Sequence, residues 1–186
     1  MTSKRFTTIA GLLAAAVLAA SIAIAAPPRA DASGGDDVVA AVNTKDGRFL
    51  YRVRLSIKRV TGDVVDNANV AAAVASCDSC ETVAVSIQGL LLFSDPSVFT
   101  PTNFALAANV GCSFCDTLAS AYQFAIQAGR PVHLTADGNR DVAQIRHQLE
   151  AIRHEGLTIF EIQAQVDALA QQLLGVLLTE VVGPPA

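Results

Sequence analysis

The residues with the most evident chemistry are four cysteines, which form two CxxC pairs. Cys77 and Cys80 lie in VASCDSCETVA, and Cys112 and Cys115 lie in GCSFCDTLASA. Two thiols at this spacing can form a disulfide, bind zinc as thiolates, or exchange disulfides with another protein. The compartment of the protein and the elements that carry the cysteines bear on which of these applies.

The N-terminus indicates that the protein is exported. Two basic residues precede an uncharged stretch from Phe6 to Ala26, and Ala23-Ile24-Ala25 supplies small residues at the spacing that signal peptidases need. We predict a signal peptide over residues 1–25 and a flexible linker over residues 26–37. Because the apolar stretch approaches the ~20 residues that span a bilayer, an N-terminal membrane anchor is the alternative. Both interpretations make the body extracytoplasmic, either secreted or at the cell envelope.

Export favours disulfides, because thiols outside the cytoplasm tend to be oxidised. We predict pairing within each motif, Cys77 with Cys80 and Cys112 with Cys115, since a CxxC across a tight turn brings the Cα atoms near the ~5.5–6 Å that a disulfide prefers. Pairing between the motifs stays open, because four cysteines allow three connectivities.

Two other uses of the cysteines remain as alternatives. With 31 residues between the pairs, Cys77, Cys80, Cys112 and Cys115 suit a structural zinc site with four thiolate ligands, which would make zinc the cofactor. An envelope thiol–disulfide oxidoreductase is less favoured, because an acid follows each motif, Glu81 or Asp116, and a neighbouring carboxylate raises the pKa of a thiol.

Each CxxC belongs to a longer repeat. NVAAAVASCDSCETVAVSIQ ends at Gln88 and NFALAANVGCSFCDTLASAYQ ends at Gln123, 35 residues later. VVAAVNTKDGRFLYRVRLSIKRV fits as a degenerate first copy, in which Asp46-Gly47 stands where the later copies have CxxC. The recurrence of Gln88 and Gln123 in register indicates a structural hydrogen bond.

The stretch after each turn alternates with period two, which is typical of a half-buried strand. In the first copy Phe49, Tyr51, Val53, Leu55 and Ile57 share one face. With a shorter Ala/Val-rich arm before each turn, this predicts three β-hairpins over residues 38–128, or about six strands of antiparallel sheet. The competing interpretation makes residues 80–93 and 115–128 helices. On the opposite face of the first copy, Arg52, Arg54 and Lys58 are expected in water, with an anion-binding face as the alternative.

The C-terminal part predicts a helical hairpin over residues 137–182. An apolar stripe runs from about Asp137 to Glu155, and Thr158 with Glu161 forms a capping box for a second helix. Two amphipathic helices after a one-sided sheet favour an α+β fold, a single domain over residues 38–182 whose helices cover the sheet.

Composition and motifs argue against several functions. Hydrophobic residues make up 52% of the chain and the formal net charge is −4, which suits a folded domain and not a nucleic-acid partner. His147, Glu150 and His154 share a helix face and could form a weak metal site, although a solvated face is the favoured interpretation. His154 begins an HExxH-like stretch that lacks the second His, and no nucleophile elbow or P-loop occurs. We therefore expect no enzyme.

One resemblance adds to these inferences. DVVDNANVAAAVASCDSCETVAVSIQ, TPTNFALAANVGCSFCDTLASAYQF and GRPVHLTADGNRDVAQIRHQLEAI together resemble a secreted actinobacterial CxxC-repeat region. The resemblance covers roughly residues 36–182, and such a region is attached in some relatives to a membrane-embedded peptide zinc metalloprotease. That protease part is absent here, so the resemblance transfers no catalytic residue. It implies an extracytoplasmic module that works beside a membrane peptidase or an exported peptide.

The function expected from the sequence is therefore an exported, non-catalytic domain with a binding or accessory role. Its CxxC pairs are expected to be structural disulfides at hairpin turns. No resident cofactor is expected unless the cysteines bind zinc.

Overall fold

The computed structural model describes residues 35–183, so the predicted signal peptide and most of the predicted linker lie outside the described residues. Six long strands form two sheets of three strands each. The first sheet contains β1 (Asp37–Asn43), β4 (Ala68–Ala75) and β7 (Thr102–Asn109), and the second contains β2 (Phe49–Val60), β5 (Glu81–Leu92) and β8 (Asp116–Gln127). All neighbouring strands in both sheets are parallel.

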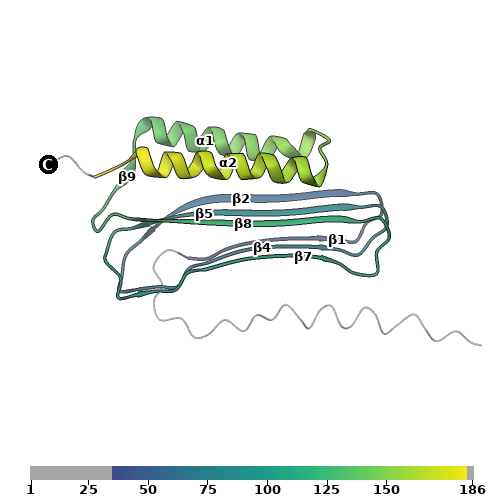
Figure 1. The fold of residues 1–186 in the computed structure, drawn as a ribbon, viewed down its shortest axis with the longest axis horizontal. Coiled ribbons are helices and arrows are strands. Elements are labelled where there is room, and N and C mark those ends of the chain that lie inside the picture. Colours follow the sequence, from purple (N-terminus) through teal and green to yellow (C-terminus); the bar gives the residue numbers. More distant parts are fainter. Residues whose placement is uncertain (1–34, 184–186) are drawn as a thin grey trace, which may run out of the picture. The chain divides into compact units, whose positions relative to one another are not determined.

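The chain winds through these sheets as a solenoid of three rungs (Figure 1). Each rung consists of a strand of the first sheet, a turn, and a strand of the second sheet. The two-residue strands β3 (Val64–Val65) and β6 (Val98–Phe99) pair with each other where the chain returns to the first sheet. One repeat of the sequence therefore corresponds to one rung.

This topology shows that the predicted antiparallel sheet of three β-hairpins was wrong. The two arms of a repeat belong to different sheets, and each arm pairs with the equivalent arm of the next repeat. Phe49 pairs with Glu81, 32 residues later, and Glu81 pairs with Asp116, 35 residues later. The period-two pattern correctly favoured strands over the competing helices, but such a pattern does not specify which strand is the partner.

Small side chains fill the space between the two sheets. The buried residues here are mainly alanines and valines: Val39, Ala41, Leu50, Ala71, Ala73 and Ala84. The middle strand β5 is buried along nearly its whole length, because the first sheet lies on one face and the helices on the other. Parallel strands are usually covered on both faces in this way.

The helical hairpin is present as predicted and covers the outer face of the second sheet (Figure 1). It consists of α1 (Ala136–Ala151), a short 3-10 turn (Ile152–His154) and α2 (Ile159–Thr179). The Thr158 side chain accepts from the Glu161 N–H and Glu161 accepts from the Thr158 N–H, which confirms the capping box. Strands β9 (His133–Leu134) and β10 (Val181–Val182) pair antiparallel and join the two ends of the hairpin.

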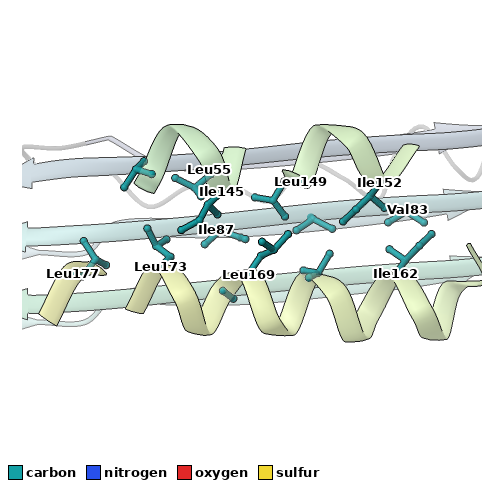
Figure 2. Packing of buried hydrophobic residues seen from close by; sticks show 14 of the residues in the cluster. Leu55, Val83, Ile87, Ile145, Leu149, Ile152, Ile162, Leu169, Leu173 and Leu177 are labelled. Atoms are coloured by element: carbon teal, nitrogen blue, oxygen red, sulfur yellow. The ribbon is translucent and has the colours of Figure 1, made fainter. Parts of the chain in front are cut away.

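The largest hydrophobic core lies between these helices and the second sheet (Figure 2). Apolar residues of α1 and α2 contact the outward-facing side chains of β2 and β5. The labelled members of this core are Leu55, Val83, Ile87, Ile145, Leu149, Ile152, Ile162, Leu169, Leu173 and Leu177. Among the described residues, no helix combines the length and apolar character needed to cross a bilayer.

Candidate functional site

The turns that join the two sheets stack on one another in register. The Gly47 N–H donates to the Asp78 carbonyl at 2.9 Å, and the Ser79 N–H donates to the Ser113 carbonyl at 2.8 Å. The Asp46 carboxylate accepts from the Asp78 N–H, and the Asp78 carboxylate accepts from the Ser113 N–H, each at 2.9 Å. These bonds extend the parallel pairing of the strands through the turns.

One position of this turn is left-handed in every rung. The φ angles of Gly47, Ser79 and Phe114 are 64°, 53° and 56°. Glycine adopts this conformation at no steric cost, which explains the Asp46-Gly47 of the first copy. A bulky residue rarely does so, and the Phe114 side chain, 91% exposed, projects into solvent from its turn.

The stacked turns carry the cysteines, and both CxxC pairs lie at disulfide-bonding distance. The Cα atoms are 6.0 Å apart in the Cys77–Cys80 disulfide and 6.1 Å apart in the Cys112–Cys115 disulfide. The first disulfide is buried, with its cysteines 5% and 3% exposed, and the second is half-buried. Both disulfides lie in turns between the two sheets, whereas the sequence analysis placed them at the turns of hairpins.

Stacking also brings the two motifs together. The sulfur of Cys80 lies 3.5 Å from that of Cys115, directly across the rungs. The sulfurs of Cys77, Cys80 and Cys115 all lie within 4.8 Å of one another, the one group of this kind among the residues that the structure describes. The oxidised form therefore holds two disulfides in contact, and the reduced form would place three thiolates close enough for a tetrahedral ion.

The acids that follow the cysteines form a stacked pair of their own. Glu81 pairs in register with Asp116, each at the start of its strand. Partial burial raises the pKa of the Glu81 carboxyl, and the neighbouring Asp116 raises it further. This acidic edge disfavours thiolates nearby, and neither CxxC opens a helix, so the arrangement does not favour thiol–disulfide exchange.

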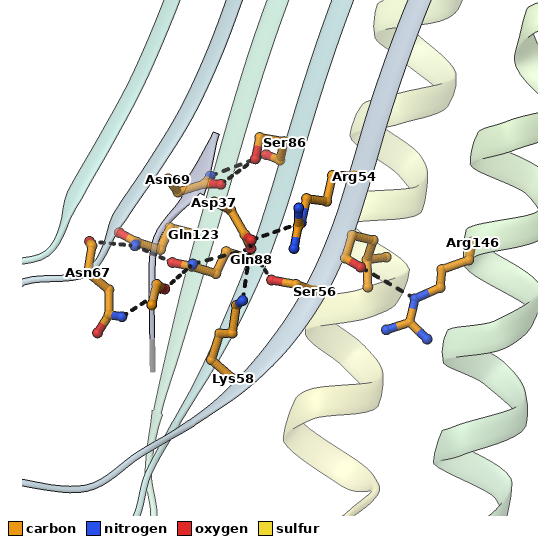
Figure 3. A network of polar contacts seen from close by, with 12 residues as sticks. Asp37, Arg54, Ser56, Lys58, Asn67, Asn69, Ser86, Gln88, Gln123 and Arg146 are labelled. Carbon is orange, nitrogen blue, oxygen red and sulfur yellow. Dashed lines mark hydrogen bonds and ion pairs between the residues drawn. The ribbon is translucent and has the colours of Figure 1, made fainter. Parts of the chain in front are cut away.

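A second polar group surrounds a buried carboxylate in the first rung (Figure 3). Asp37 is fully buried and accepts hydrogen bonds from Ser56 and from Gln88, the latter at 3.3 Å. Arg54 and Lys58 neutralise it, with nitrogen atoms 2.9 Å and 3.4 Å from one carboxylate oxygen. Arg52, Arg54 and Lys58 were expected in water, and Arg52 and Arg54 are indeed exposed. Arg54 and Lys58 also reach the first sheet through Asp37, and the Lys58 side chain is only 21% exposed.

The sequence analysis missed Asp37, which it assigned to the end of the flexible linker. The repeat itself contains the missing signal, because Asp37 pairs in register with Asn69, and Asn69 pairs with Asn103. Asp37 is therefore the first-copy equivalent of two asparagines.

Two amide ladders connect the rungs. The Gln123 amide donates to the Gln88 side-chain oxygen at 2.7 Å, which confirms a structural hydrogen bond. The Asn69 amide donates in the same way to the Asn103 side-chain oxygen at 2.8 Å. These bonds fix the register of the rungs, because a shift by one residue would leave buried amides without partners.

A cleft of about 440 Å³ lies between β2, β9 and α1. Its lining combines apolar side chains with basic ones and a histidine, and no acidic residue lines it. The lining residues are Ile57, Lys58, Arg59, Leu91, His133, Leu134, Asn139, Val142 and Arg146. A cleft with this lining repels cations and favours anions.

The other predicted metal-site residues lie on the exposed face of α1 and the turn after it. Glu150 forms an ion pair with Arg153, while His147 and His154 are exposed. This placement agrees with the favoured interpretation of a solvated face.

Comparison of the chain with protein-family models, with curated proteins and with solved structures finds no match. The functional inference therefore rests on the geometry of the site and on the sequence patterns described above.

Proposed function

We propose that the chain is an exported, non-catalytic module with a binding or accessory role, in which two disulfides clamp the turns of a β-solenoid. The observation that carries the proposal is the stacking of the two CxxC turns, each with its cysteines paired internally. Closing so short a loop mainly fixes the conformation of a turn. This use suits a domain that presents a surface, and it needs an oxidising compartment.

The outer face of the first sheet supports a binding role. Its outward side chains are apolar in all three rungs, and several large ones are exposed: Val38, Val42, Phe104 and Leu106. Monomeric proteins rarely expose a contiguous apolar patch of this kind unless it contacts something. By the resemblance in sequence, we propose a membrane peptidase or an exported peptide as the partner.

The proposal is tested by the intact mass of the protein recovered from an exporting host, alkylated before unfolding, with and without reduction. We expect removal of a segment of about 25 residues, no alkylation, and a mass about 4 Da below that of the reduced form, because each disulfide lacks two hydrogens. Four alkylated thiols would contradict disulfide clamping, and a chain that keeps its N-terminal segment would contradict cleavage of a signal peptide.

A structural zinc site is the second candidate, favoured by the three cysteine sulfurs within 4.8 Å of one another. In this case Cys112 would supply the fourth thiolate after a small movement of its turn. Native mass spectrometry of the same material would then show one zinc ion bound to a chain without disulfides. A chelator would remove the zinc and make all four cysteines accessible to alkylation.

A further inference from the structure

The third rung leaves both sheets open along one edge. Within the described residues β7 pairs only with β4, and β8 pairs only with β5. Ala71 and Ala73 of the second rung are fully buried between the sheets, whereas their register partners Ala105 and Ala107 in β7 are exposed. Side chains that form core in the second rung therefore meet solvent in the third.

The open edge also presents unpaired backbone groups. The N–H groups of Thr102, Asp116 and Ala128 all donate to carbonyls of the second rung at 3.0 Å. Because the direction of pairing alternates along a strand, the odd-numbered residues of β8 direct their N–H and C=O groups to the open side. The Ala121 carbonyl already accepts from the Asn103 amide at 2.9 Å, which leaves it one lone pair, and no strand pairs with the N–H groups of this row in the described residues. Such a row is a template for another strand.

Charge distinguishes this edge from the opposite one. Strands β1 and β2 of the first rung carry five charged residues: Asp37, Arg52, Arg54, Lys58 and Arg59. Strands β7 and β8 carry one, Asp116 at the turn, just as the covered strands β4 and β5 carry only Glu81. Charged edge strands resist pairing, so the first edge is protected, whereas the third rung has the composition of a covered rung.

We propose that the open edges of two copies pair around a two-fold axis, β7 against β7 and β8 against β8, each antiparallel. Each edge strand pairs with the identical strand of the second copy, so the paired strands have equal lengths. Because the edge is nearly uncharged, the two copies approach without repulsion between like charges. The two-fold places the two Asp116 residues at opposite ends of a 12-residue strand, about 36 Å apart.

The same charges exclude an open-ended arrangement. Stacking the third rung of one copy on the first rung of another would bring Arg52 and Arg59 of β2, and the Asp37 cluster with Arg54 and Lys58, against an uncharged strand that offers these charges no new partner. Removing charges from water without such compensation is costly. The dimer is therefore closed, because pairing consumes the edge that the described residues leave unprotected in each copy. This inference goes beyond the proposed function and does not depend on it.

Sedimentation of the oxidised, exported protein over a range of concentrations tests the proposal. We expect a particle of twice the chain mass. Ala107→Lys should weaken the association at least ~100-fold, because the lysine reaches water in the monomer but would be buried without a partner in the dimer. Ala40→Lys is the matched control, since Ala40 is exposed on the outer face of β1, away from this edge, and this variant should remain dimeric.

Hydrogen exchange of the β8 amides provides a second measurement that does not require a variant. At dimer concentrations the Ala119 and Ala121 N–H groups should be protected, and dilution should remove that protection while the Leu118 N–H stays protected. Monomers with unprotected Ala119 and Ala121 would overturn the proposal. Monomers with these amides protected would overturn it as well, because the edge would then be covered within a single chain. Fibrous growth would contradict the closed two-fold.

Discussion

Removal of each disulfide by paired alanine substitution gives the most informative stability comparison. Each disulfide has a sequence separation of three, so it closes a loop of four residues. The loop-closure entropy for this length predicts that each disulfide adds about 1.9 kcal/mol to the free energy of unfolding at 25 °C. Its removal should therefore lower Tm by roughly 4–8 °C in a domain of this size. This is the expected loss for Cys112→Ala with Cys115→Ala, whose disulfide is half-buried.

The variant Cys77→Ala with Cys80→Ala should lose more stability, because these cysteines are only 5% and 3% exposed and their removal also empties core space. Thermal and urea unfolding under oxidising conditions, with intact mass measured on the same samples, provides the comparison. Reduction of the wild type in the presence of a chelator is the control, and it should lower stability toward that of the variants. Equal stability of both variants and the oxidised wild type would refute the clamping role, and loss of stability by chelation alone would indicate zinc.

Three further predictions concern single side chains. Ile87→Ala should cost about 2–5 kcal/mol in urea unfolding, because Ile87 is fully buried beneath the helices, whereas Phe104→Ala on the exposed face of β7 should cost far less. Phe114→Gly should raise the free energy of unfolding by about 1 kcal/mol by relieving a left-handed residue, and Gly47→Ala should lower it; a loss of stability in Phe114→Gly would show that the phenyl ring makes stabilising contacts. Burial and the neighbouring Asp116 raise the folded-state pKa of Glu81 above its ordinary value of 4.5, so the folded protein binds this proton more tightly and its stability declines as pH rises from about 4.5 through the folded-state pKa. Glu81→Gln should be more stable than the wild type at pH 7 and lack this part of the decline. An unchanged pH profile of stability in this variant would contradict the assignment.

Local structure could be predicted from the sequence because it depends on short-range patterns. The alternation from Phe49 to Ile57 predicted a strand, and Thr158 with Glu161 predicted the start of the second helix. The recurrence of Gln88 and Gln123 in register predicted a structural role in hydrogen bonding, although not that the two side chains bond to each other. Each of these inferences needs only a period or a spacing, and the structure confirms all three.

The pairing of the strands could not be predicted in the same way. A short turn between two strands is compatible with a hairpin, whose arms share a sheet, and with an arch, whose arms lie in different sheets. The small residues that line the sheet interior, such as Ala73 and Ala84, favour close stacking of two sheets, but their pattern resembles that of a weak hairpin arm. Asp37 was missed for a related reason, since its role is apparent only when it is aligned with Asn69 and Asn103 as rungs.

The central claim is that the cysteine turns belong to rungs stacked in parallel, and backbone nuclear Overhauser contacts test it most directly. The structure pairs Arg52 with Ala84 and Ala84 with Ala119, so backbone contacts should link these three residues in that order. Backbone contacts between β4 and β5 across the Cys77–Cys80 turn, in the ladder of an antiparallel hairpin, would contradict the solenoid and the stacking of the cysteines.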